Sequence, residues 1–141
     1  IGIDNCKKTI LNAKKNLSNL KLHNRARLLH KPIDSLFGFK FDLIVSNPPY
    51  VVNRDIKRLS DDITSYEPRS ALDGGNDGLD VIRKVIYKSR SILKSNGILA
   101  LEIGAGQYAQ VMKVLTENKF KLKETIKDYQ SNIRCIISTL L

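Results

Sequence analysis

The sequence lacks the features that mark secreted or membrane-bound proteins. It contains two cysteines, and Cys6 and Cys135 lie far apart with no CxxC spacing, so neither a disulfide framework nor a metal site is expected. No apolar run approaches the roughly 20 residues needed to cross a bilayer, which excludes a membrane-spanning protein. No basic leader precedes an apolar stretch, so nothing predicts a signal peptide. These absences favour a reducing, cytoplasmic location.

Acidic residues are scarce relative to basic ones. The chain has 24 lysines and arginines against 14 acidic residues, a formal net charge of +10. Such a balance suits a polyanionic partner such as RNA or the ribosome. However, the lysines occur singly or in pairs along the whole chain, as on solvated helix faces, and no basic stripe is interleaved with aromatic residues for stacking on bases. We therefore favour a general compositional bias and do not expect nucleic acid to be the substrate.

The order of apolar runs and amphipathic segments predicts an α/β fold in a single domain. Strands are predicted at 1–4, 25–29, 41–46, 98–103, 120–126 and 133–140, and helices at 6–22, 56–63, 78–95 and 107–118. Asn96-Gly97 is predicted to cap the third of these helices. Strands separated by helices imply a parallel sheet with helices on both faces, and the last two strands form an antiparallel pair.

Polar residues follow several of the predicted strands. Asp4, the segment 47–50 and the segment 102–106 each come after a strand. In sheets of this kind ligands bind beyond the carboxyl ends of the strands, so we expect these residues to share one rim.

The sharpest chemical signal is Asn47-Pro48-Pro49-Tyr50 at the end of a buried strand. Because the two prolines have no N–H group and a fixed φ, this turn presents carbonyl acceptors on a stiff backbone. Asn47 adds a side-chain acceptor and Tyr50 a flat ring, which together suit a planar group bearing NH2. Hydrogen bonds to both N–H groups would localise the nitrogen lone pair in the transition state of an alkylation. The alternative is a plain turn that ends a strand.

Two segments carry a family resemblance. Residues 41–51, FDLIVSNPPYV, resemble the signature of amino-methylating enzymes that use S-adenosylmethionine. Residues 66–80, YEPRSALDGGNDGLD, resemble one branch of them, the HemK/PrmC glutamine methyltransferases, and this run is far more specific than NPPY alone. Further matches to that branch are LEIG at 101–104 with Gln107 after it, and Asp128 followed by Arg134. The resemblance covers essentially the whole chain.

The resemblance implies a Rossmann-like class I methyltransferase sheet and methylation of the glutamine in the GGQ motif of peptide chain release factors. Asn47 and Pro48 would hold the glutamine amide, with Pro49 and Tyr50 beside it, and Asn47, Pro48 and Tyr50 would be the catalytic residues. Glu67 would help to shape the substrate pocket. Asp4 would bind the ribose hydroxyls of S-adenosylmethionine, with Asn47 also at the cofactor. Asp4 could instead be an ordinary acid at a helix start.

The sequence departs from the family pattern in its Gly-rich cofactor loop, which belongs upstream of Asp4 and is absent. Gly104-Ala105-Gly106 follows the wrong strand, and we interpret it as a tight strand-to-helix turn. The first strand would also be missing from the centre of the sheet, leaving an exposed edge and apolar face. We therefore expect residues 1–141 to be the C-terminal part of a catalytic domain, without the N-terminal substrate-recognition region. We also expect the isolated chain to be weakly active or inactive.

Two other functions remain open. An adenine amino-methyltransferase acting on nucleic acid would use the same NPPY chemistry and would suit the positive charge. The YEPR and ALDGG segments argue against it. A truncated module that only binds a translation partner would explain the missing Gly-rich loop, whereas the intact NPPY turn argues for catalysis.

Overall fold

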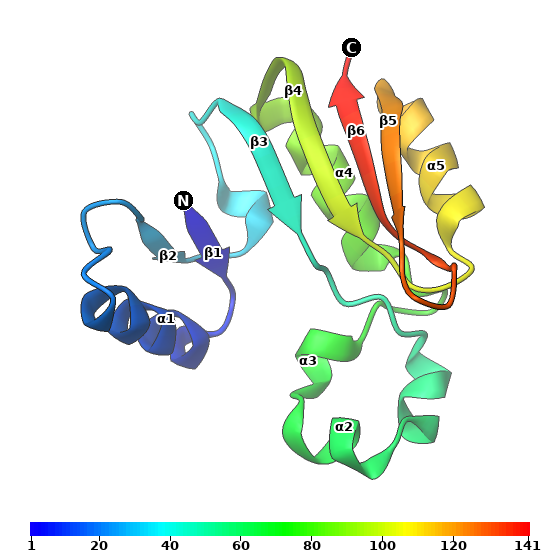
Figure 1. Ribbon diagram of the computed structural model, residues 1–141, viewed down its shortest axis with the longest axis horizontal. Coiled ribbons are helices and arrows are strands. Elements are labelled where there is room, and N and C mark those ends of the chain that lie inside the picture. Colours follow the sequence, from blue (N-terminus) through cyan, green and yellow to red (C-terminus); the bar gives the residue numbers. More distant parts are fainter. The chain divides into compact units, whose positions relative to one another are not determined.

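The computed structural model describes residues 1–141, which divide into two compact units, Ile1–Gly38 and Phe39–Leu141 (Figure 1). The first unit consists of β1 (Gly2–Asp4), α1 (Lys7–Asn19), β2 (Leu28–His30) and the 3-10 helix η1 (Ile33–Ser35). Strands β1 and β2 pair in parallel in a sheet of their own, with Gly2 opposite Leu28. Helix α1 contacts both strands and buries Ile10.

The second unit is built on a four-stranded sheet in the order β3-β4-β6-β5. Its elements are β3 (Phe41–Ser46), η2 (Asn53–Arg58), α2 (Asp61–Tyr66), α3 (Arg69–Leu72), α4 (Asp80–Ile92), β4 (Leu93–Glu102), α5 (Tyr108–Glu117), β5 (Phe120–Lys127) and β6 (Ile133–Leu140). Strands β3 and β4 are parallel, whereas β6 is antiparallel to both of its neighbours. The α/β class and the antiparallel C-terminal pair are therefore confirmed.

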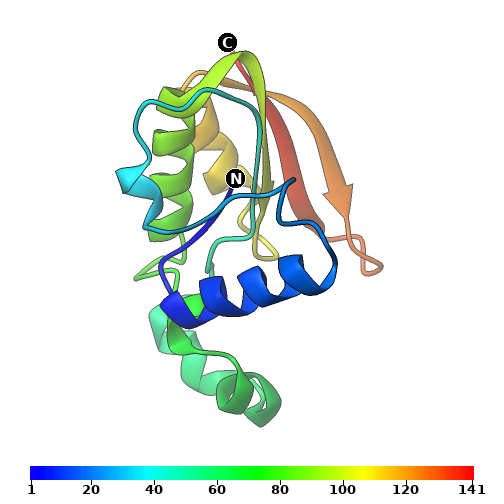
Figure 2. The ribbon, with the colours of Figure 1, turned by 90° about the vertical axis from the view of Figure 1, so that its left-hand side faces the viewer.

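Helices α4 and α5 form the cover of this sheet. They contact each other and lie on the same side of the strands, as Figure 2 shows. Their apolar residues recur at helical spacing and are fully buried, as are the strand residues opposite them: Ile82, Ile86, Val111 and Leu115 on the helices, and Leu99, Leu101 and Ile136 on the strands. Each such side chain contributes about 1.5–3 kcal/mol when removed from water. The result is a rigid floor for the loops at the carboxyl ends of β3 and β4.

Strand β3 has the predicted bounds but is not buried as expected. It pairs with β4 on one side only, and Leu43 and Val45 are 54% and 72% exposed, respectively. Half-buried Ile44 lies between them, as the two-residue period of a strand requires. The expectation of a free edge and an exposed apolar face is confirmed.

The prediction that Asn96-Gly97 caps a helix is wrong. Helix α4 ends at Ile92, and Leu93 is already extended and paired with Phe41. Leu93 is 1% exposed, and the free energy gained by burying it in the sheet favours the extended conformation over one more helical residue. Asn96 has a φ of +61° within the irregular start of β4.

The segment after β3 contains more regular structure than predicted. A single short helix was expected at 56–63, whereas the structure has η2, α2 and α3 in succession between Asn53 and Leu72. No helix of the structure combines the length and the apolar character that crossing a membrane requires.

Candidate active site

The Asn47–Tyr50 turn begins where β3 ends at Ser46. Pro48 and Pro49 cannot donate to a sheet ladder, so the strand stops there and the chain leaves the sheet. Asn47 is exposed, Pro48 is buried, and Pro49 and Tyr50 are half-buried. The sequence therefore fixes the end of the strand and the stiffness of the turn locally.

The turn forms one wall of a cavity of about 460 Å³. The residues predicted to bind substrate, namely Asn47, Pro48, Pro49, Tyr50 and Glu67, all line it. The rest of the lining is largely apolar and comes from the segment of η2, α2 and α3, through residues such as Leu59, Ile63 and Leu72. No protein group is hydrogen-bonded to the side chain of Asn47, so its amide oxygen is available to a ligand. Whether these residues bind substrate stays a prediction.

The ALDGG segment holds the turn from one side. The N–H of Val51 donates to the carbonyl of Leu72 at 2.9 Å, and the N–H of Gly74 donates to the carbonyl of Val51 at 2.8 Å. These bonds make a parallel bridge between Val51 and Asp73. The two most specific motifs of the sequence are therefore joined through their backbones, which the sequence alone does not show.

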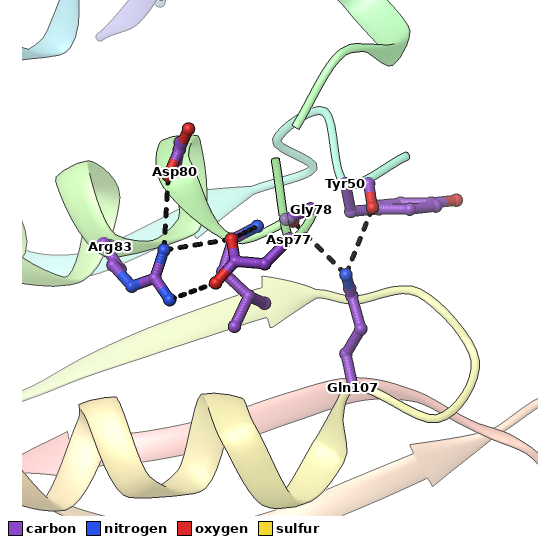
Figure 3. A network of polar contacts seen from close by, with 7 residues as sticks. Tyr50, Asp77, Gly78, Asp80, Arg83 and Gln107 are labelled. Carbon is purple, nitrogen blue, oxygen red and sulfur yellow. Dashed lines mark hydrogen bonds and ion pairs between the residues drawn. The ribbon is translucent and has the colours of Figure 1, made fainter. Parts of the chain in front are cut away.

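The loop that follows is fixed by its own acidic side chains. Asp73 accepts the N–H of Gly75 at 3.0 Å, and Asp77 accepts the N–H of Leu79 at 3.0 Å. Both carboxylate oxygens of Asp77 also pair with Arg83 on α4 (Figure 3). The guanidinium group, followed by the Leu79 N–H, lowers the pKa of Asp77 below its usual value, and Asp77 raises the pKa of Arg83.

Tyr50 is oriented by groups at the carboxyl end of β4 and the start of β6. Its hydroxyl accepts a hydrogen bond from Arg134 at 2.8 Å and donates to Glu102 at 3.3 Å. The guanidinium carbon of Arg134 also lies 5.3 Å from the centre of the Tyr50 ring. Arg134 is 3.8 Å from Glu102 and 4.0 Å from Asp128. The expected shared rim of the β3 and β4 ends is confirmed. Family motifs included these residues, but only folding shows that they hold Tyr50.

Asp4 lies in the first unit, at the end of β1. Its Oδ1 accepts the N–H of Cys6 at 2.6 Å, and Cys6 is the residue before α1. The helix-start interpretation of Asp4 is therefore observed, and a carboxylate with a second oxygen can still accept from a ligand. Its cofactor role and its place on a common rim with Asn47 stay predictions.

The Gly104-Ala105-Gly106 segment is the tight turn predicted from the sequence. The N–H of Gln107 donates to the carbonyl of Gly104 at 3.2 Å, Gly106 has a φ of +82°, and α5 begins at Tyr108. The connection of β4 to α5 accounts for these glycines without a role in binding the phosphate or methionine part of a ligand.

Solved structures of methyltransferases share this fold. The chain matches a ribosomal protein L11 methylase from Lactobacillus delbrueckii with a TM-score of 0.69 at 17% identity, covering 99% of this chain and 57% of that one. It matches the N-methyltransferase NodS from Bradyrhizobium japonicum, solved with S-adenosyl-L-homocysteine, with a TM-score of 0.59 at 15% identity, covering 98% and 64%. At these identities the likeness shows the fold, which is that of class I methyltransferases.

The sequence places the chain within a family of this class. The profile of the family described as Eco57I restriction-modification methylase matches residues 2–134, and the chain belongs to that family. It is 40% identical over 131 residues to a release factor glutamine methyltransferase from Clostridium acetobutylicum, covering 89% of this chain and 45% of the relative. It is 41% identical over 98 residues to a ribosomal protein uL3 glutamine methyltransferase from Francisella tularensis, covering 69% and 31%. The resemblance to the HemK/PrmC branch is therefore confirmed.

The chain spans less than half the length of these two relatives. The names of these relatives describe whole proteins.

Proposed function

We propose that this chain belongs to a catalytic domain that transfers a methyl group from S-adenosyl-L-methionine to a glutamine side-chain amide. The proposed target is the glutamine in the GGQ motif of peptide chain release factors. We place the reaction in the cytoplasm, where these partners work. The names of the relatives support the reaction class, and the match over 89% of this chain supports the assignment to this segment. The proposal depends most on one observation, the turn with two donor-free prolines that lines a cavity.

The turn can hold a flat carboxamide. Asn47 Oδ1 and the carbonyl of Pro48 would accept the two N–H groups, while the ring of Tyr50 packs beside the amide plane. A planar amide nitrogen is a poor nucleophile because its lone pair is delocalised. Acceptors that draw both hydrogens out of the plane favour a pyramidal nitrogen, and this gain appears mainly in the transition state.

The residues present fit the methyl donor in part. The Asp4 carboxylate at the end of β1 would accept the two ribose hydroxyls, and Asn47 is the residue of the second unit that would also bind the donor. When bound, S-adenosyl-L-methionine supplies an electrophilic methyl carbon, whose bond to sulfur breaks as the bond to nitrogen forms. No strong base is required in this chain, because the proton leaves after positive charge develops on the nitrogen. Positioning by the turn contributes to an effect worth up to about 7–11 kcal/mol in ideal cases.

We also propose that residues 1–141 are a C-terminal part of the catalytic domain. The Gly-rich cofactor loop and the substrate-recognition region would then be supplied by other residues of the protein. The share of each relative that the chain covers supports this. Sequencing or expression of the region upstream of Ile1 tests it, and a strand ending in a Gly-rich loop is the expected result.

Transfer of radiolabelled methyl groups by the intact protein distinguishes the substrates. The expected result is labelling of a release factor and no labelling of its GGQ→GGA variant. Labelling of ribosomal protein uL3 in place of the release factor would support glutamine methylation but contradict the release factor as the substrate. Robust labelling of DNA or RNA would overturn the proposal in favour of nucleic-acid adenine methylation, an alternative that the +10 charge would suit and that the family description, a restriction-modification methylase, supports.

Two substitutions separate the roles of the turn and the strand-end acid. Asn47→Ala should lower kcat by about 10²-fold or more, as loss of one preorganised group does, with little change in cofactor affinity. Asp4→Ala should instead weaken cofactor binding by roughly 10- to 100-fold and leave kcat near the original value. Asp4→Asn is the control, since its amide oxygen can still accept the Cys6 N–H. Equal loss of both parameters in both variants would contradict the assignments.

A further inference from the structure

The side chain of Gln107 joins three segments of backbone. Its Oε1 accepts the N–H of Gly104 at 2.8 Å, while its Nε2 donates to the carbonyl of Tyr50 at 3.1 Å and to the carbonyl of Gly78 at 3.2 Å. Figure 3 shows this amide pointing from the start of α5 towards Tyr50 and Gly78. Both donor hydrogens and one acceptor site are therefore used within the protein.

These segments meet as closely as glycine permits. A Cβ at Gly78 would lie 2.5 Å from the carbonyl oxygen of Tyr50 and 2.7 Å from Gln107 Nε2. A Cβ at Gly104 would lie 2.8 Å from Gln107 Oε1 and 3.1 Å from Tyr50 Cδ2. This junction, the space between Tyr50, Gly78 and Gly104, is thus just large enough for the Gln107 side-chain amide. A shorter side chain would not span it, and any side chain at these glycines would fill it.

The Asn47–Tyr50 turn needs such an external tie. Pro48 and Pro49 fix φ but have no N–H, so two of the four residues of the turn cannot donate a backbone hydrogen bond. On one side it is held through the bridge of Val51 to Asp73. Gln107 supplies the tie on the other side, from a helix packed on the sheet, at the carbonyl of Tyr50.

We propose that Gln107 is a positioning residue for methyl transfer, which sets where the acceptors of Asn47 and Pro48 lie. It does not contact the substrate. This inference rests on the proposed function of the turn and adds a residue to which that function gave no role. A displacement of the order of 1 Å at a reacting group can cost about 10²-fold in rate, so a tie of this kind affects kcat more than binding.

Gln107→Glu is the decisive variant, because it keeps the size of the side chain and the acceptor for Gly104. At high pH its carboxylate faces two carbonyl oxygens and cannot donate, whereas the protonated acid can donate to one of them. At pH 8.5, kcat per folded molecule should fall by about 10²-fold with a KM for the methyl donor within about threefold of the original. The ratio of variant to original kcat should rise about tenfold as the pH is lowered to 6. Gln110→Glu adds the same charge to an exposed position of α5 and is the matched control.

Folding is monitored separately by circular dichroism and by hydrogen exchange of residues 47–53 in the intact protein. Gln107→Ala, which adds no charge, should accelerate exchange in that segment severalfold relative to Gln110→Ala, even if the original protein does not methylate a release factor. In that case the proposed substrate is wrong, but the role of Gln107 in holding the Asn47–Tyr50 turn is supported. Unchanged exchange, or a Gln107→Glu variant whose kcat and pH profile match those of Gln110→Glu, would overturn the inference.

Discussion

The close approach at Gly78 predicts a large loss of stability on substitution by alanine. Gly78 and Gly106 have similar backbone conformations, with φ of +76° and +82°. They differ in surroundings, because a Cβ at Gly106 meets nothing within 4 Å, whereas one at Gly78 meets the Tyr50 carbonyl and the Gln107 amide. The pair therefore separates backbone strain from crowding at the junction.

The magnitudes follow from these contacts. A left-handed alanine costs about 1–2 kcal/mol, partly offset by about 0.4–1 kcal/mol from the less flexible unfolded chain, so Gly106→Ala should lose about 1 kcal/mol. Gly78→Ala should pay the same cost and also disrupt the two hydrogen bonds of Gln107 Nε2, each worth about 1 kcal/mol. Its total loss should be about 3 kcal/mol, a difference of about 2 kcal/mol between the variants.

Urea denaturation of the intact protein measures both free energies of unfolding, with unchanged m-values as the condition for comparison. In a Gln107→Ala background the extra cost of Gly78→Ala should shrink, because the two Gln107 hydrogen bonds that it disrupts are already absent, while the close contact with the Tyr50 carbonyl remains. Losses for Gly78→Ala and Gly106→Ala that agree within about 0.5 kcal/mol would refute the description of the junction as close-packed.

Two further outcomes follow from charged groups near the turn. Asp77→Asn keeps an acceptor for the Leu79 N–H but removes one of the two carboxylates that pair with Arg83, while Asp80 remains. Because the folded-state pKa of Asp77 is lowered, its stabilisation is present above the unfolded pKa of about 3.9 and is lost as the pH falls through the folded value. The stability difference between the two proteins should therefore shrink below about pH 4, and a difference that stays constant from pH 7 to 2.5 would contradict this. Tyr50→Phe removes the hydroxyl between Arg134 and Glu102. Thermal denaturation should show a loss of only about 1 kcal/mol in the free energy of unfolding, because those two groups, 3.8 Å apart, can then pair directly. An unchanged free energy of unfolding would show that the hydroxyl is not held there.

Helices and strands with strong local signals could be predicted from the sequence. Apolar runs located β3 and β6 closely, and the helical period of apolar residues located α1 and α5, because a buried helix face requires that period. The prolines after Ser46 marked the end of β3, since they cannot continue a ladder. Predictions failed where packing overrode local preference, as at Leu93, which leaves α4 in order to be buried opposite Phe41.

The sequence by itself determined which residues could do the chemistry. An amide acceptor beside two prolines and a tyrosine is a local arrangement, fixed by covalent structure and backbone dihedrals, and it indicated an alkylation of a planar NH2 group before any fold was known. The motif segments likewise indicated the family from the order of residues alone. Neither conclusion required knowledge of a contact between distant residues.

Only the tertiary structure decided how that turn is held. The bonds from Gln107 to Tyr50 and Gly78 and the contacts of Arg134 with Tyr50 join residues 29 to 84 positions apart. Hydrogen bonds between such distant groups depend on the packing of α5 against the sheet and on the place of β6 beside β4, which no local pattern encodes. The stiffness of the turn is therefore a property of its sequence, whereas its position is a property of the fold.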